Sequence, residues 1–218
     1  MTTLSDIRTD YQKSILQLSD LNPNPICFFK EWLNQAIAAN IHEPNAMCIS
    51  TVDKNAQPDA RIVLLKYMDD SRLGFYTNHH SQKAQQIAEN PNCALVFFWK
   101  ELERQVRIKA HLQIMDEQTA TDYYQSRPKD SQIAAWASPQ SQVITDRQIL
   151  EDNFIELQQR YQQETLLPKP PNWGGYFIIP HQFEFWQGRS SRLHDRFIYT
   201  FANKKNTIDG WLIERLAP

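Results

Sequence analysis

Residues 106–114 read Val-Arg-Ile-Lys-Ala-His-Leu-Gln-Ile, an unbroken alternation of apolar and polar side chains. Successive side chains of a β-strand point to opposite faces, so this period of two places one face in a core and the other in water. The stretch therefore predicts a long, half-buried strand, and the elements on either side of it decide what kind of sheet it joins.

The sequence before this strand predicts both helices and strands. Apolar residues spaced by three and four predict a helix over 4–18, and Asn24 followed by Pro25 predicts the start of a second helix that runs to about Asn40. β-Branched and aromatic residues then predict a hairpin around the polar turn 53–57. Its strands are 46–52 and 61–67, and they are followed by a strand at 73–76, a helix at 81–89 and a strand at 93–99.

The sequence after the strand predicts three helices and then a second group of strands. The helices are expected at 117–126, 130–137 and 146–162, and the strands at 175–179, 183–187, 196–202 and 211–216, with a turn at 203–206. The proline-rich stretch 168–171 is a stiff connector that is too short to separate two domains. The fold class predicted is α+β, a mainly antiparallel sheet or barrel with helices packed outside, in a single domain over 1–218.

Composition excludes several classes of protein. The chain of 218 residues has 5 glycines, and none is placed to form a dinucleotide-binding turn or a phosphate-binding P-loop. A net charge of -2 does not favour nucleic acid as a partner. The longest apolar run, 93–99, is too short for a membrane span, and the first residues lack the features of a signal peptide, so we expect a cytosolic protein.

Familiar catalytic and metal motifs are also missing from the sequence. It contains no GxSxG elbow, no HExxH and no Cys/His cluster with metal-ligand spacing, so no metal site is expected. The 3 cysteines are widely spaced, which fits reduced, buried thiols. The residues that stand out are Arg, Lys, Ser, Tyr and Gln at strand ends and in loops, a chemistry suited to phosphate binding without a glycine loop.

Two clusters of such residues precede position 132. Arg61 and Lys66 stand at the two ends of an apolar strand and, being five residues apart, should point to opposite faces. Further along the chain, 76–83 ends a strand and begins a helix, where hydrogen-bond donors could converge on an anion. The alternative for 76–83 is a capped surface helix with a solvated lysine. In the second cluster, Tyr123, Arg127 and Ser131 are spaced by four, and Pro128 should push Arg127 into an extended turn suited to a phosphate; an ordinary helix connection is the alternative.

The third cluster is 192–196, Arg-Leu-His-Asp-Arg. In an extended chain Arg192, His194 and Arg196 line one face, and the two arginines should lower the pKa of the histidine by charge repulsion. A neutral imidazole of this kind can donate to or accept from an anionic ligand, whereas a lone histidine is more often structural. Trp186 could wall a flat ring nearby, or pack in the core with its phenylalanine neighbours.

Taken together, these segments resemble the pyridoxamine 5'-phosphate oxidase family over nearly the whole chain. The segments that carry the resemblance are 61–66 (RIVLLK), 75–78 (FYTN), 102–106 (LERQV), 126–132 (SRPKDSQ), 185–188 (FWQG), 192–197 (RLHDRF) and 215–218 (RLAP). Several long motifs in one order are much more specific than any one of them. The resemblance implies a flavoprotein with an FMN-binding split barrel and surrounding helices, and a homodimer with the flavin at the subunit interface.

The resemblance also implies roles for individual residues. The positions implied for FMN are Arg61, Ile62, Val63, Leu64, Leu65, Lys66, Tyr76, Thr77, Gln82, Lys83, Gln105, Gln140, Ser141, Trp186 and Arg196. The positions implied for the substrate are Lys66, Tyr123, Arg127 and Ser131 at its phosphate, Arg192 and His194 as catalytic residues over the reacting carbon, and Arg8 and Tyr11 in a segment, 1–20, that can close over it. Residues 172–218 would complete the site at the dimer interface.

Two positions depart from the family pattern. Gln82 stands where many relatives have arginine, which removes one charge from the phosphate site, and 12–15 (Gln-Lys-Ser-Ile) lacks the glycines that relatives often carry in the closing segment. The first change predicts weaker flavin binding, and the second makes the mobility of the segment an open question.

The activity implied is oxidation of pyridoxine 5'-phosphate or pyridoxamine 5'-phosphate by dioxygen, which gives pyridoxal 5'-phosphate and hydrogen peroxide. In such an enzyme the flavin supplies the redox chemistry, and the protein supplies binding and orientation. Two alternatives remain at this point: a split-barrel protein that binds flavin or pyridoxal phosphate without turnover, and a flavin reductase with another substrate. The intact cluster at Tyr123, Arg127 and Ser131 disfavours a substrate without a phosphate.

Overall fold

The computed structural model describes residues 3–202 and 210–218, so the turn predicted at 203–206 lies outside the described residues. The strands are β1 (Ala46–Val52), β2 (Pro58–Leu64), β3 (Tyr67–Met68), β4 (Leu73–Asn78), β5 (Asn92–Trp99), β6 (Arg104–Ile114), β7 (Trp173–Gln187), β8 (Asp195–Phe201) and β9 (Trp211–Leu216). The helices are α1 (Pro25–Ala38), α2 (Gln82–Glu89), α3 (Glu117–Ser126), α4 (Lys129–Ala137) and α5 (Gln148–Arg160), with 3-10 turns at Leu4–Asp6, Lys100–Leu102, Leu18–Asp20 and Ser190–Arg192. The α+β class is confirmed, and most element boundaries agree with the sequence within a few residues.

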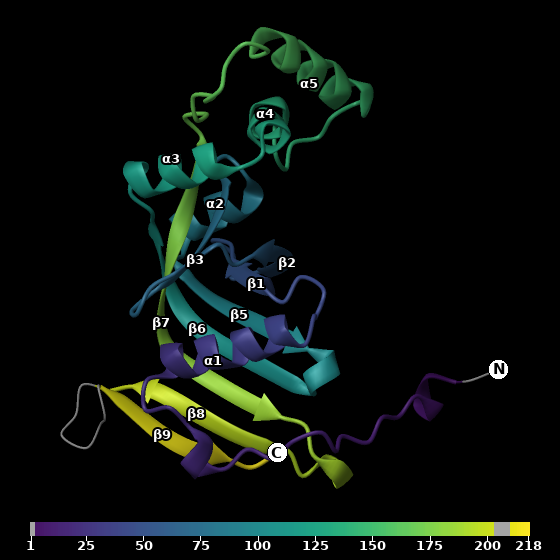
Figure 1. The fold of residues 1–218 in the computed structure, drawn as a ribbon, viewed down its shortest axis with the longest axis vertical. Helices are drawn as coiled ribbons and strands as arrows, with labels where there is room; N and C mark the ends of the chain where they lie inside the picture. The colour runs from purple at the N-terminus through teal and green to yellow at the C-terminus, as the bar shows by residue number, and fades with distance from the viewer. Residues whose placement is uncertain (1–2, 203–209) are drawn as a thin grey trace.

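All pairings in the sheet are antiparallel, in the order β2-β1-β5-β6-β7-β4-β3, with β8 paired to β7 and β9 paired to β8. Among the described strands β2 and β3 stand at the two ends of this order without pairing to each other, so the sheet is an open, split barrel. The long strand expected at 106–114 is β6, which lies in the middle of the sheet and buries Val106, Ile108 and Ala110. Figure 1 shows α3, α4 and α5 gathered at one end of the molecule and β8 and β9 at the other.

Strand β7 joins these two ends, and it is one strand where the sequence predicts two. Its first part pairs with β4 up to Ile178, its last part pairs with β8 from Gln182, and β6 runs along its other side. A register shift opposite Lys109 and Ala110 leaves His181 without a Cα partner. Pro180 has no N–H to donate, and it is tolerated because it sits at this irregularity, after the pairing with β4 ends and before the pairing with β8 begins.

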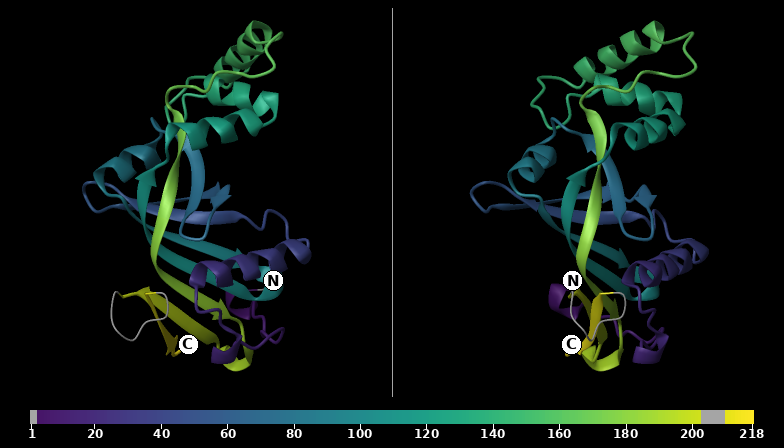
Figure 2. Two further views of the ribbon diagram at one scale, coloured as in Figure 1. Left: turned by 60° about the vertical axis from the view of Figure 1, so that its left-hand side comes forward. Right: turned by 90° about the vertical axis from the view of Figure 1, so that its left-hand side faces the viewer.

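The main core is formed by apolar side chains of α1 and of the sheet. Figure 2 shows α1 lying against the sheet from two sides. Asn24 accepts hydrogen bonds from the N–H groups of Ile26 and Cys27, so the predicted cap is confirmed. Phe28 packs on Phe185 with ring centroids 4.6 Å apart. A smaller core under α3, α4 and α5 contains Tyr124, Ile133, Leu167 and Trp173. In the described part of the chain, no helix combines the length and apolarity needed to cross a membrane.

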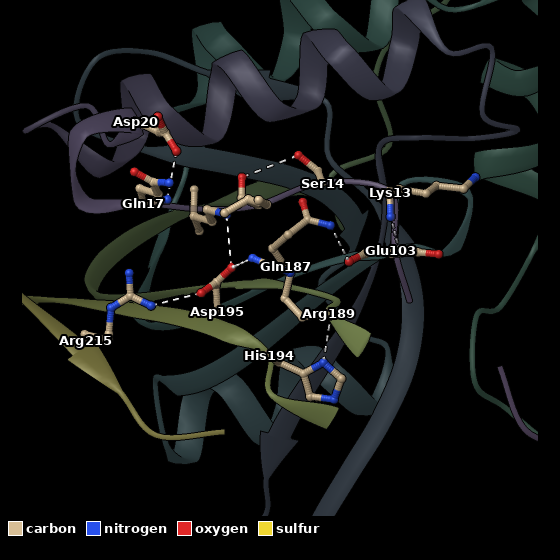
Figure 3. Close-up of polar contacts among 12 residues, drawn as sticks. Lys13, Ser14, Gln17, Asp20, Glu103, Gln187, Arg189, His194, Asp195 and Arg215 are labelled. Carbon is tan, nitrogen blue, oxygen red and sulfur yellow. Dashed lines mark hydrogen bonds and ion pairs between the residues drawn. The ribbon is translucent and has the colours of Figure 1, made fainter. Parts of the chain in front are cut away.

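The helix predicted over 4–18 is wrong. Apart from the turns at Leu4–Asp6 and Leu18–Asp20 the segment has no helix, and Leu4, Ile7, Ile15 and Leu18 are exposed. Its backbone is bonded to distant carboxylates: the Lys13 N–H donates to Glu103 at 2.9 Å and the Leu16 N–H donates to Asp195 at 3.1 Å (Figure 3). These donors are used across the molecule, so they are not available for a helical ladder.

Candidate functional site

A cavity of about 420 Å³ opens where β2, β4, α2, α3 and α4 meet. Many of the residues predicted to bind the cofactor or the substrate phosphate line it: Arg61, Ile62, Val63, Leu64, Lys66, Tyr76, Thr77, Lys83, Tyr123, Arg127 and Gln140. A volume of this size falls in the range of small-molecule sites. We call this the strand–helix cavity.

The expectation that Arg61 and Lys66 face apart is wrong. Strand β2 ends at Leu64 and β3 begins at Tyr67, so Lys66 lies outside the regular strand, and both cations line the same cavity. The alternation rule holds only while the strand continues. The short break between β2 and β3 therefore adds a second cation to the cavity.

The corner between β4 and α2 is built from small polar groups around Lys83. The Lys83 ammonium donates to Thr77 Oγ1 at 3.2 Å and to Ser81 Oγ at 3.4 Å. Burial and then the Arg61 charge lower the pKa of Lys83. Removing a lysine from water beside another cation has this effect, and an anion placed here would oppose it.

Arg127 occupies the position predicted from Pro128. Helix α3 ends at Ser126, Arg127 is extended with φ -75° and ψ 152°, and α4 begins at Lys129. Its Nη1 is buried and finds no hydrogen-bond partner among the described residues. An unsatisfied buried donor on a cation is costly, and a ligand oxygen would relieve that cost. The cavity therefore suits an anionic group.

An aromatic stack forms one wall of the strand–helix cavity. The Tyr76 ring stacks on Tyr123 at 4.0 Å and on Trp173 at 5.4 Å, and the Arg127 guanidinium lies 5.0 Å from the Trp173 ring. Burial raises the pKa of Tyr76 to about 12 and also raises the pKa of Tyr123. Both phenols are therefore hydrogen-bond donors at neutral pH.

Trp173 is a site residue that the sequence did not reveal. It pairs with Asn78 across β4 and β7, and it follows a loop after α5, so no local pattern links it to Tyr76. The next residue, Gly174, is needed for close packing, since a Cβ there would lie 2.6 Å from His79 Cε1. In the sequence, the two glycines that follow Trp173 are the one local sign that this position is closely packed.

A second cavity, of about 550 Å³, lies between the N-terminal segment and the turn before β8. Its lining includes Arg8, Tyr11, Arg192 and His194. The His194 ring lies 4.6 Å from the Trp186 ring and 5.9 Å from the Tyr11 ring. The structure thus brings together the residues predicted to be catalytic and the predicted closing segment. We call this the terminal cavity.

The protonation of His194 follows from its contacts. Its Nδ1 accepts the Arg189 backbone N–H at 3.1 Å, as Figure 3 shows, so the neutral ring carries its proton on Nε2. Burial, followed by the charges of Arg192 and Arg196, lowers the pKa of His194. The predicted direction is confirmed, and burial is the larger cause.

The expected extended conformation of 192–196 is wrong at its start. Ser190–Arg192 forms a 3-10 turn in which Ser191 and Arg192 have φ 55° and 61°, and β8 begins only at Asp195. Two consecutive non-glycine residues in the left-handed region carry strain, which is typical of functional sites. Arg192 and His194 line the terminal cavity together, and Arg196 lies beyond it in the strand.

Gln105, Trp186 and Arg196 form a row across β6, β7 and β8. Glu184, on β7, fixes the last of them: its Oε1 accepts from Arg196 Nε at 3.0 Å and from Nη2 at 2.8 Å. The same carboxylate accepts from Arg107 at 3.0 Å. This row lies at the same end of β7 as the terminal cavity.

The remaining predicted positions line neither cavity. Leu65 is buried in the core, Gln82 is exposed at the first residue of α2, Ser131 is half-buried on α4, and Ser141 is exposed with φ 70°. The two cavities themselves lie toward opposite ends of β7. Trp173 lines the strand–helix cavity, and Trp186 lies beside the terminal cavity. At roughly 3.3 Å per residue, these two tryptophans are ~40 Å apart along the strand.

The fold and the cation-rich cavity define an open split-barrel protein with a site for an anionic small molecule. Residues 33–161 match the family described as "Pyridoxamine 5'-phosphate oxidase", and residues 173–218 match the "Pyridoxine 5'-phosphate oxidase C-terminal dimerisation region". The chain belongs to the pyridoxamine 5'-phosphate oxidase family, as its sequence motifs predicted.

Known proteins resemble the chain over its whole length. It is 48% identical to a pyridoxine/pyridoxamine 5'-phosphate oxidase of Acaryochloris marina over 100% of this chain and 96% of that protein. It is 47% identical to the protein of the same name from Burkholderia thailandensis, over 100% of both chains.

Two solved structures share the fold. PhzG from Burkholderia lata 383, in complex with tetrahydrophenazine-1-carboxylic acid, superposes with a TM-score of 0.84 at 28% identity, over 94% of this chain and 98% of that one. A pyridoxamine 5'-phosphate oxidase-related, FMN-binding protein of Nostoc punctiforme has a TM-score of 0.69 at 17% identity, over 87% of this chain and 97% of that one. The latter supports the split-barrel fold alone.

Proposed function

We propose that this protein is an FMN-dependent oxidase that converts pyridoxine 5'-phosphate and pyridoxamine 5'-phosphate to pyridoxal 5'-phosphate, with dioxygen as electron acceptor. The products besides pyridoxal 5'-phosphate are hydrogen peroxide and, from the amine, ammonia, which places the reaction in vitamin B6 cofactor synthesis or salvage. The observation that carries the proposal is the buried Arg127 Nη1, which lies beside Tyr123 in the strand–helix cavity and has no hydrogen-bond partner within 3–202 and 210–218. Relatives 47% and 48% identical carry this activity in their names.

The residues of the strand–helix cavity fit FMN as cofactor. Arg61 and Lys83 offer charge to its phosphate, Thr77 offers a hydroxyl, and residues 62–64 line the space for the rest of the molecule. Bound flavin would supply the two-electron chemistry that no side chain here can supply. The protein's own task is to neutralise charge and to hold the donor carbon in place.

The substrate phosphate would be held by Lys66, Tyr123, Arg127 and Ser131. Arg127 and Tyr123 line the cavity, and both the phenol and the Arg127 Nη1, which has no partner among the described residues, suit phosphate oxygens. Arg192 would polarise the group on the reacting carbon, and His194, with its proton on Nε2, would orient it or hold a proton. Arg8 and Tyr11 would close over the bound substrate.

A homodimer is part of the proposal, because the two cavities lie too far apart along β7 to serve one substrate within one chain. The terminal cavity contains Arg192 and His194, which lie inside 173–218, the region matched to a dimerisation region. We infer that each site combines the strand–helix cavity of one subunit with Gln105, Trp186, Arg192, His194 and Arg196 of the other.

The test is an anaerobic mixture of the flavin-loaded protein with pyridoxine 5'-phosphate, followed by air. We expect bleaching of the flavin absorbance, recovery on aeration, and one peroxide per turnover. Unphosphorylated pyridoxine is the matched control and should bleach the flavin far more slowly, because it cannot use Arg127. A yellow protein that neither phosphorylated substrate bleaches would refute the oxidase and leave a flavin-binding protein.

A second candidate is suggested by the structural likeness to PhzG, whose structure contains a tetrahydrophenazine carboxylic acid. A tricyclic carboxylate would need no phosphate site, and the identity to PhzG is 28%, against 48% to a pyridoxine/pyridoxamine 5'-phosphate oxidase. Bleaching of the flavin by the tetrahydrophenazine but by neither vitamer would favour this rival.

A further inference from the structure

The guanidinium of Arg61 is held by three side chains behind the strand–helix cavity. Its Nη1 donates to Thr51 Oγ1 at 2.6 Å, and its Nη2 donates to Gln86 Oε1 at 3.0 Å and to Asp59 Oδ2 at 2.5 Å. Asp59 and Arg61 are two residues apart on β2, so their side chains share a face, and Thr51 lies opposite Asp59 on β1. Thr51 and Gln86 position Arg61 without charge, whereas Asp59 adds a negative charge.

Asp59 makes Arg61 different from the other cations of the cavity. Within residues 3–202 and 210–218, Arg61 forms an ion pair, while no ion pair involves Lys66, Lys83 or Arg127. Asp59 also acts on Lys83, since its charge opposes the lowering of the Lys83 pKa by burial and by Arg61. One carboxylate thus offsets both cations that face the proposed cofactor phosphate.

Resting on the proposed function, we propose that Asp59 limits the affinity of this protein for FMN by offsetting the charge that Arg61 and Lys83 present to the phosphate. A carboxylate this close to the phosphate repels it and also competes for the same guanidinium. Thr51 and Gln86 hold both terminal nitrogens of Arg61, and Gln86 Nε2 in turn donates to Asp59 Oδ2 at 3.4 Å, a contact that an amide oxygen in place of the carboxylate can keep. The negative charge of Asp59 therefore costs affinity, whereas the geometry requires only an acceptor oxygen at this position.

The size of the effect is limited by water. The Asp59 side chain is 37% exposed and that of Arg61 is 20% exposed, so the charge is partly screened. We expect the substitution Asp59→Asn, which keeps an oxygen for Arg61, to tighten FMN binding roughly fivefold, about 1 kcal/mol at 1.4 kcal/mol per tenfold.

The experiment titrates the full chain, freed of flavin, with FMN and with riboflavin, and follows quenching of flavin fluorescence. Asp59→Asn should lower the Kd for FMN, leave the Kd for riboflavin unchanged because riboflavin has no phosphate, and lose its advantage as salt is raised. The matched control is Asp152→Asn, which makes the same charge change on α5, where the Asp152 side chain accepts only from Gln148 among the described residues. It should bind both flavins as the unaltered protein does.

Each contrary outcome has a distinct meaning. Unchanged FMN binding by Asp59→Asn would overturn the proposal, and weaker binding would overturn it and make Asp59 a positioning residue for Arg61. Equal tightening for riboflavin would also overturn it, because the effect would not act through the phosphate. If the unaltered protein binds neither flavin, the proposed function itself fails, and this inference fails with it.

Discussion

His194 is a residue whose environment decides its charge. Its Nδ1 accepts the Arg189 N–H, and its ring packs against the rings of Trp186 and Tyr11. Burial, Arg192 and Arg196 all disfavour the imidazolium. In the folded protein the pKa lies below the ordinary histidine value of about 6.5, so the neutral ring persists to lower pH than it does in the unfolded chain.

The first prediction concerns the pH dependence that follows. Because the folded-state pKa is lowered, the stability contributed by neutral His194 is fully present above about pH 6.5 and is lost as pH falls through the folded pKa. Removing one of the flanking charges, by Arg192→Gln, should raise the pKa of His194 toward its ordinary value. The measurement is the chemical shift of the His194 ring as a function of pH.

Arg160→Gln provides the control for this titration, since Arg160 lies on α5 at the far end of the molecule. It should leave the His194 titration where it is. An unchanged His194 pKa in Arg192→Gln would mean that the Arg192 charge is screened by water and that burial and Arg196 account for the lowered pKa.

At the scale of elements, the N-terminal segment shows how a correct pattern can give a wrong structure. The apolar spacing of 4–18 is helical, yet the segment is extended over most of its length and reaches Glu103 and Asp195 with its backbone donors. Glu103 is 7% exposed and Asp195 is 9% exposed. Local periodicity cannot register bonds to carboxylates so far along the chain.

The second prediction tests this anchoring. Asp195 also accepts from Arg189 and Arg215, so Asp195→Asn weakens a charge-assisted network and leaves its shape. We expect amide exchange in 8–16 to speed up on the order of tenfold, because a hydrogen bond to a charged group contributes roughly 1.5–3 kcal/mol. Hydrogen exchange followed by mass spectrometry measures it.

Peptides from β6 serve as the internal reference, since their exchange reports the central sheet. Exchange that rises equally in 8–16 and in β6 would indicate general loss of stability. Exchange that changes in neither would show that Asp195 does not hold the segment.

Other elements were predictable because their signals are local. The alternation of β6, the cap of α1 and the break at Pro128 each depend on neighbours in sequence, and the structure confirms all three. The joining of 175–179 and 183–187 into one strand was missed because Pro180 resembles a break. It is tolerated because it lies at a register shift, between the pairing with β4 and the pairing with β8, which is a property of the assembled sheet.

At the scale of the whole molecule, the sequence predicted which residues form the candidate site but not how they are arranged in space. The clusters around Arg61 and Arg127 do share one cavity, which spacing alone could not show, because β2, β4 and α3 meet only in the fold. The cluster around His194 lies toward the other end of β7. The residue types predicted an anion-binding site, whereas the distance between the clusters depends on how the strands pair.

This separation leads to the third prediction, that two inactive variants restore each other. Arg127→Gln disables the strand–helix cavity and Arg192→Ala disables the terminal cavity, so each homodimer should be nearly inactive. In a mixed dimer, isolated through two different affinity tags, one of the two shared sites contains both intact groups. We expect about half of the wild-type turnover per dimer, since the two sites of a symmetric dimer are equivalent.

A pair of variants from the same cavity supplies the control for this experiment. Arg192→Ala combined with His194→Ala leaves every shared site with a defect, so that mixed dimer should stay inactive. If Arg127→Gln and Arg192→Ala also fail to restore each other, although both tagged chains co-purify and bind flavin, then the two residues act within one chain. The two cavities of one chain, ~40 Å apart along β7, could then meet only if the fold rearranged. A site shared between two subunits requires no such rearrangement.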